Sequence, residues 1–159
     1  MGLIDSKDIV DFIVTNYKHA KKIVEVMIGN HPWIAIGIKK RLPNVELLVT
    51  DIDLEKLKDI KTKFPFLKCI SDDIMLPSLN LYEGADLIYA IRPPPELINE
   101  IVKLGIKIKS DVLIRSYSNE TCGFEFEKRK GWIKIKYGYA MLNLLRYKSL
   151  IKIGKSLNG

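Results

Sequence analysis

The chain has 159 residues, of which 47% are hydrophobic, and a formal net charge of +7. A chain of this length buries roughly 70% of the surface of its unfolded form, which predicts one domain over residues 1–159 that needs no metal or disulfide to fold. No apolar run approaches the ~18 residues of a membrane span. The acidic N-terminal segment lacks the basic and apolar character of a signal peptide. These features predict a cytoplasmic protein with no membrane partner.

The charge is unevenly distributed along the chain. Residues 1–102 carry 13 basic and 15 acidic side chains, a net of −2, whereas residues 103–159 carry 13 and 4, a net of +9. A basic C-terminal third favours an anionic partner such as RNA or a phosphorylated small molecule. The alternative is a lysine-rich surface that only keeps the protein in solution. The absence of glutamine and the abundance of lysine and isoleucine indicate a thermophilic source.

Strands alternate with helices through most of the chain. An N-terminal helix is expected within residues 5–18, with Asp5 or Ser6 as its N-cap. In the βα units of residues 22–117, short apolar runs predict strands over residues 23–29, 45–50, 67–71, 87–91 and 111–117. Amphipathic segments bounded by prolines predict helices over residues 32–42, 54–64 and 95–104.

The pattern changes after residue 117. Residues 124–127 and 133–137 alternate apolar and charged side chains, and residues 129–131 between them are typical of a hairpin turn, which would set glutamates opposite lysines. A second tight turn at Gly138 leads to a strand over residues 141–147. We therefore expect an antiparallel meander over residues 123–148. The whole pattern predicts an α/β, Rossmann-like fold with a twisted, mostly parallel sheet and this meander at its edge.

Polar residues stand where each of the first four predicted strands ends. With their neighbours they are Gly29, Asn30 and His31, then Asp51 and Ile52, then Asp72, Asp73 and Ile74, and finally Arg92 and Pro93. The carboxyl ends of parallel strands meet at one edge of a sheet, and open α/β sheets bind ligands at that edge. We therefore expect these residues to surround a ligand site.

Asp51 lies about twenty residues past the first turn, where nucleoside-binding Rossmann folds place an acid that accepts hydrogen bonds from ribose hydroxyls. A carboxylate suits this role because it accepts two bonds from a vicinal diol. The alternative is that Asp51 caps the helix that follows, a role for which Asp53 is equally well placed. The sequence thus favours a nucleoside-type cofactor.

Asp72 or Asp73 would accept a hydrogen bond from an adenine amino group, with Ile52 and Ile74 flanking the ring. The alternative is that the two aspartates form an Asx-turn pair. Both interpretations stay open from the sequence.

Arg92 is followed by three prolines, which cannot donate to a β-ladder and so end the strand over residues 87–91. We expect Arg92 to face the ligand and bind a carboxylate or phosphate. The alternatives are a solvated charge on a stiff turn, or a salt bridge to Glu96 or Asp73. His31 would reach a carboxylate or phosphate as well, or lie on the surface as an ordinary polar residue.

The segment Tyr82-Glu-Gly-Ala-Asp-Leu-Ile-Tyr-Ala-Ile-Arg-Pro-Pro-Pro-Glu-Leu97, with Ile23-Val-Glu-Val-Met-Ile-Gly29, resembles uncharacterised protein family 0146. This small archaeal family has a class I methyltransferase-like fold. The resemblance implies that fold, and it implies S-adenosylmethionine as the cofactor. It also implies that Glu25 corresponds to the acid of the first methyltransferase motif and Gly29 to its second glycine.

This chain departs from that motif, Glu-x-Gly-x-Gly-x-Gly, at two glycines. Met27 stands at the first and His31 at the third. Missing side chains let the backbone approach the cofactor, so Met27 either fills the core beneath the turn or obstructs the methionine arm of the site. No Ser/His/Asp group, Cys/His pair, metal cluster or P-loop is recognisable, and we predict neither a catalytic residue nor a metal site.

Two functions follow. The first is S-adenosylmethionine-dependent methyl transfer to an acceptor such as RNA or an anionic small molecule. The second is a non-catalytic nucleoside- or RNA-binding module that keeps the fold, which the altered glycine turn favours. Because the chain has no separate substrate domain, an acceptor must be small, or be held by the basic meander or by the partner protomer of a homo-oligomer.

Overall fold

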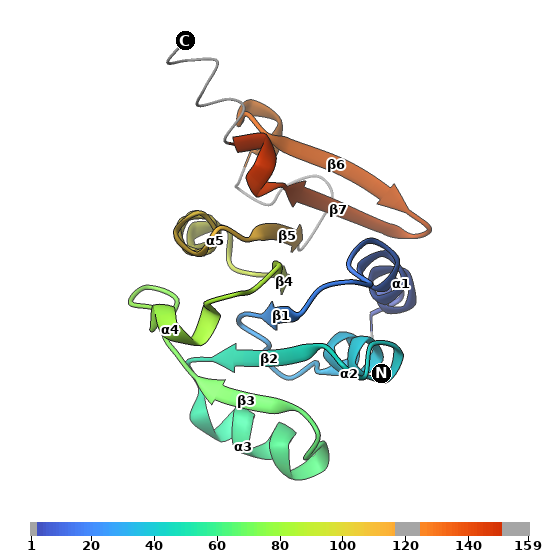
Figure 1. The fold of residues 1–159 in the computed structure, drawn as a ribbon, viewed down its shortest axis with the longest axis vertical. Helices are drawn as coiled ribbons and strands as arrows, with labels where there is room; N and C mark the ends of the chain where they lie inside the picture. Colours follow the sequence, from blue (N-terminus) through green and yellow to red (C-terminus); the bar gives the residue numbers. More distant parts are fainter. Residues whose placement is uncertain (1–2, 117–124, 151–159) are drawn as a thin grey trace.

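The computed structural model describes residues 3–116 and 125–150, and in them seven strands form one sheet (Figure 1). The strands are β1 (Lys22–Glu25), β2 (Glu46–Asp51), β3 (Lys68–Ser71), β4 (Leu87–Ile91), β5 (Asp111–Arg115), β6 (Trp132–Tyr137) and β7 (Ala140–Leu145). Their order is β3-β2-β1-β4-β5-β7-β6. The first five pair in parallel, and β7 pairs antiparallel with both β5 and β6.

Helices cover both faces of this sheet. They are α1 (Ser6–Asn16), α2 (Trp33–Arg41), α3 (Leu54–Lys63), α4 (Leu79–Tyr82) and α5 (Ile98–Ile108), with the 3-10 helices η1 (Pro95–Leu97) and η2 (Phe126–Lys128). Side chains of α1, α2 and α3 share one core with the sheet, and those of α4 and α5 share the other. Among the described residues, no helix is long and apolar enough to cross a bilayer. The predicted α/β, Rossmann-like class is confirmed.

The N-terminal helix forms as predicted, with Asp5 at the N-cap position and Ser6 as the first helical residue. The backbone carbonyl of Asp5 accepts from the N–H of Ile9 at 3.0 Å, but its side chain makes no capping hydrogen bond. The Asp5 side chain is only 1% exposed and accepts a hydrogen bond from Arg115 Nε at 2.8 Å. A carboxylate this buried is stabilised by a cationic partner. Asp5 therefore ties the start of the chain to the end of β5.

The C-terminal meander forms in part. The second turn is confirmed, because Gly138 adopts a φ of 58° and joins β6 to β7 in an antiparallel pair. The strand expected over residues 124–127 is wrong where the structure describes it, because Phe126–Lys128 forms the 3-10 helix η2. Glu125, which precedes η2, pairs with Lys128 at 2.9 Å. For this glutamate, a pair within one turn stands in place of the predicted cross-strand pair.

Other boundaries shift for local reasons. The first strand ends at Glu25 rather than at residue 29, because Met27 has a φ of 58°, which no strand accommodates. The segment from Pro95 starts as 3-10 helix and continues as α5, which ends at Ile108 and is followed by its C-cap Lys109 at a left-handed φ of 61°. The short helix α4 was not predicted, since four residues carry too little periodicity to recognise.

Candidate functional site

A cavity of about 290 Å³ opens at the carboxyl edge of the parallel strands. Its lining comes from the ends of β1, β2 and β3, from α4 and from η1: Val26, Met27, Thr50, Asp51, Ile52, Asp72, Asp73, Ile74, Met75, Tyr82 and Leu97. Asp51 and Ser71 are register partners in β2 and β3, so the residues that follow these two strands lie side by side. The cavity thus brings together Asp51, Ile52, Asp72, Asp73 and Ile74, as predicted.

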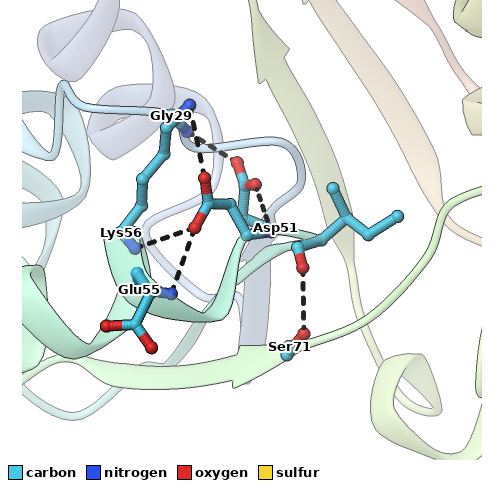
Figure 2. Close-up of polar contacts among 7 residues, drawn as sticks. Gly29, Asp51, Glu55, Lys56 and Ser71 are labelled. Carbon is cyan, nitrogen blue, oxygen red and sulfur yellow. Dashed lines mark hydrogen bonds and ion pairs between the residues drawn. The ribbon is translucent and has the colours of Figure 1, made fainter.

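Asp51 holds the turn after β1 against the start of α3 (Figure 2). Its Oδ2 accepts a hydrogen bond from the backbone N–H of Gly29 at 2.9 Å, and its Oδ1 accepts one from Asp53 N–H at 2.9 Å. Asp53 is the N-cap of α3, because its side chain accepts from the backbone N–H groups of Glu55 and Lys56. Asp51 is therefore not the cap. A carboxylate has about four acceptor positions, so roughly half of this one's capacity is available to a ligand.

The two aspartates after β3 have different roles. Tyr82 Oη donates to Asp72 Oδ2 at 2.6 Å, and the backbone N–H of Ser78 donates to the same carboxylate. Burial, together with this hydrogen bond to Asp72, raises the pKa of Tyr82, so the phenol stays a donor. Asp73 Oδ1 accepts from Met75 N–H at 2.9 Å, which is the Asx-turn interpretation. Asp72 is thus held in the wall of the cavity by a side chain from α4.

Six of the predicted site residues do not line this cavity: Glu25, Gly29, Asn30, His31, Arg92 and Pro93. Gly29 acts on it indirectly, through its hydrogen bond to Asp51. Asn30, His31 and Arg92 are exposed, whereas Pro93 is buried. The backbone N–H of Arg92 donates to the carbonyl of Arg115 at 2.7 Å, which fixes the turn after β4 against β5. Ligand binding by Arg92 stays a prediction.

Glu25 lies in the sheet itself, 1% exposed, and its register partner on β4 is Tyr89. Tyr89 Oη donates to Glu25 Oε1 at 2.6 Å. Burial raises the pKa of Glu25 to about 8, against a usual value near 4.5, although the hydrogen bond from Tyr89 opposes the shift. Side chains alternate along a strand, and Val24 packs with the cavity residues Ile74 and Tyr82. Glu25 therefore points to the opposite face of the sheet.

Two residues at this edge have strained backbones. Met27 has a φ of 58° and Arg92 a φ of 53°, and they follow the paired strands β1 and β4. A left-handed conformation costs roughly 1–2 kcal/mol for a residue other than glycine, and such strain clusters at functional sites. Met27 takes this conformation at the position where the methyltransferase motif has a glycine. It is also half-buried and lines the cavity.

The chemistry of the lining selects its ligands. Asp51, Asp72 and Asp73 present carboxylate oxygens, and none of the described lining residues is basic. Ile52, Ile74 and Leu97 offer apolar contact to a flat ring. In residues 3–116 and 125–150, no group of three or more His, Cys, Asp and Glu side chains could hold a metal ion. The cavity therefore suits a ligand with an apolar ring and several hydrogen-bond donors.

The sequence profile of the uncharacterised protein family UPF0146 matches residues 6–141. The chain belongs to this family. A UPF0146 protein from Archaeoglobus fulgidus is 38% identical over 107 residues, which are 67% of this chain and 75% of that protein. A UPF0146 protein from Methanocaldococcus jannaschii is 34% identical over 116 residues, 72% of this chain and 81% of that protein. The sequence resemblance is thus confirmed.

Solved structures show the same fold. A human methyltransferase 10 domain containing protein superposes with a TM-score of 0.64 at 10% identity, covering 92% of this chain and 84% of that chain. An O-methyltransferase family protein from Burkholderia thailandensis gives 0.61 at 11% identity. Its match covers 89% of this chain but 56% of that longer one. This chain therefore has a class I methyltransferase-like, Rossmann-like fold.

Several lining residues were not predicted. Thr50 carried a recognisable signal, because it is a polar residue at the end of an otherwise apolar run. Tyr82 carried none, since its contact with Asp72 depends on how α4 folds back onto the sheet. The apolar members Val26, Met75 and Leu97 resemble any core or surface residue in the sequence. Met27 was noted as a departure from the motif, and the structure places it in the cavity wall.

Proposed function

We propose that this protein is methyltransferase-like and binds the adenosine part of an S-adenosylmethionine-type ligand in the cavity at the carboxyl edge. One observation carries the proposal. The same cavity is lined by Asp51 and Ile52 at the end of β2 and by the residues that follow β3, Asp72, Asp73 and Ile74, although about twenty residues of chain separate the two groups. Ligands of open α/β sheets bind at this edge.

The donors and acceptors support an adenine nucleoside. The remaining acceptor positions of Asp51 suit the two hydroxyls of a ribose, because both of its oxygens are already oriented by backbone N–H groups. Ile52 and Ile74 supply apolar contact for the base. Asp72, held by Tyr82, supplies an acceptor for an amino group. The adenosine part of the ligand fits the residues present.

The methionine part of an S-adenosylmethionine-type ligand fits the cavity less well than the adenosine part. This difference leaves two candidate functions, methyl transfer and nucleoside binding without catalysis. Methyl transfer requires a donor aligned with its acceptor near attack distance, and the acceptor would be RNA or an anionic small molecule near the basic C-terminal segment. The fold favours this activity. A non-catalytic nucleoside-binding module is the second candidate, and Met27 in the cavity wall is the observation that favours it.

Calorimetric titration with adenosine tests the proposal, using Ile52→Ala and Leu76→Ala as a matched pair. Ile52 is 68% exposed and lines the cavity, whereas Leu76 is 82% exposed and does not. Loss of the apolar contact at Ile52 costs about 1 kcal/mol, or about a fivefold weaker Kd. Leu76→Ala should leave the Kd unchanged. Absence of binding to the unmodified protein at millimolar adenosine would refute the proposal.

A further inference from the structure

The backbone around Met27 fixes the direction in which its side chain leaves the main chain. The N–H of Val26 donates to the carbonyl of Tyr89 on β4 at 3.0 Å, and the N–H of Ile28 donates to the carbonyl of Thr50 on β2 at 3.1 Å. Met27 is thus anchored between both neighbouring strands and held at a left-handed φ of 58°. The turn cannot rotate to redirect the Cα–Cβ bond of Met27 away from the cavity without breaking these bonds.

Met27 is the last residue of the turn after β1 that lines the cavity. Its described lining comes from the ends of β1, β2 and β3, with α4 and Leu97, and includes no residue of β4. The turn beyond Met27, with Gly29, Asn30 and His31, does not line it either. At about 290 Å³ the volume of the cavity lies just below the ~300–1,000 Å³ range of ligand pockets. A ligand arm that continued past Met27 would have to displace it.

The negative charge of the cavity wall excludes ligands that carry a phosphate. Asp51, Asp72 and Asp73 line the cavity, and no basic side chain lies among its described lining residues. A phosphate close to these carboxylates would be repelled and would find no cation to compensate. Hydroxyl and amino groups, by contrast, are the donors that carboxylates accept.

We infer that the cavity takes a free, uncharged nucleoside, and that the Met27 side chain excludes nucleosides extended by an amino-acid arm. This inference rests on the nucleoside-binding part of the proposed function, and it selects the second candidate, a nucleoside-binding module, over methyl transfer. Met27 is then the specificity-determining residue: a glycine here would relieve the left-handed strain and open the end of the cavity. A 5′-phosphate is attached at the same end of the ribose as the amino-acid arm, so it meets Met27 as well, and the three aspartates also repel its charge.

Calorimetric titration with three probes tests this: adenosine, adenosine monophosphate and S-adenosylhomocysteine. The unmodified protein should bind adenosine at least tenfold more tightly than either of the others. Met27→Gly should tighten S-adenosylhomocysteine at least tenfold, leave adenosine within threefold and still reject the monophosphate. Met27→Leu, which keeps the volume of the side chain, should behave as the unmodified protein does. Met27→Ala replaces the glycine variant if that variant fails to fold.

The outcomes of these titrations distinguish a failure of this inference from a failure of the proposed function. The inference is overturned if the unmodified protein binds S-adenosylhomocysteine as tightly as adenosine, or if Met27→Gly leaves the ratio of the two Kd values unchanged. In either case Met27 does not close the site, while nucleoside binding stands. Tight binding of the monophosphate would overturn the charge argument. If no probe binds any variant, the proposed function fails and the inference falls with it.

Discussion

The buried Glu25 makes stability depend on pH in a direction opposite to that of most carboxylates. In the unfolded chain this carboxyl ionises near its usual value of 4.5, whereas burial raises its pKa in the folded protein to about 8. Between these values the folded state holds a proton that the unfolded state has lost. Stability therefore falls as the pH rises from about 4.5 to about 8 and levels off above that.

The size of this loss of stability follows from the difference between the pKa values of Glu25 in the folded and unfolded states. Each unit of pKa difference corresponds to about 1.4 kcal/mol, so the shift of Glu25 amounts to a loss on the order of 5 kcal/mol between these two pKa values. Glu25→Gln has the same shape and stays uncharged, and its Oε1 still accepts from Tyr89 Oη, as in the present pair. The variant should match the unmodified protein near pH 4.5 and exceed its stability by several kcal/mol at pH 9.

Denaturant unfolding at pH 5, 6, 7, 8 and 9 measures this difference. Comparison of the two proteins at each pH cancels the titration of the other carboxyls, and Glu83→Gln, at an exposed glutamate, serves as the matched control with a flat difference. If the difference between Glu25→Gln and the unmodified protein is also flat across this range, Glu25 is ionised in the folded state. The assignment of a neutral buried pair would then be wrong.

Two further predictions concern charges elsewhere. Asp5→Ala should cost about 3 kcal/mol of unfolding free energy, because it removes a buried partner of Arg115. The control Asp59→Ala, at an exposed pair with Lys63, should cost less than about 0.5 kcal/mol. Equal losses of the two variants in denaturant melts would refute the distinction between buried and exposed pairs. If the basic C-terminal segment binds RNA, filter-binding affinity should fall with salt by a slope of about −0.7 per phosphate contact, and no association at low salt would leave the charge as a solubility feature. The residues concerned are Lys128, Arg129, Lys130, Lys134 and Lys136.

The site residues that could be predicted from the sequence are those whose position depends on short stretches of chain. Asp51 and Asp72 follow apolar runs that end abruptly, and parallel pairing then brings such strand ends together. Residues whose role depends on distant contacts could not be found this way. Tyr82 reaches Asp72 only after α4 folds back, and Asp5 meets a partner 110 positions away.

The sequence did not predict the helix η2 or the left-handed backbone of Met27, for a related reason. Alternation over residues 124–127 is too short a pattern to distinguish a strand from a 3-10 turn. A left-handed φ at a methionine goes against its intrinsic preference, and the hydrogen bonds of Val26 to β4 and of Ile28 to β2 help to hold it there. Local patterns thus predict the edge of the sheet and several cavity residues, while the shape of the cavity depends on tertiary contacts.

A crystal structure of the unmodified protein grown with saturating adenosine tests nucleoside binding most directly. We predict electron density for the base between Ile52 and Ile74 and for the ribose hydroxyls within hydrogen-bond distance of Asp51, with Met27 still in the cavity wall. Density for the nucleoside at another surface, or an empty cavity at saturating ligand, would contradict the assignment of this edge as the nucleoside site.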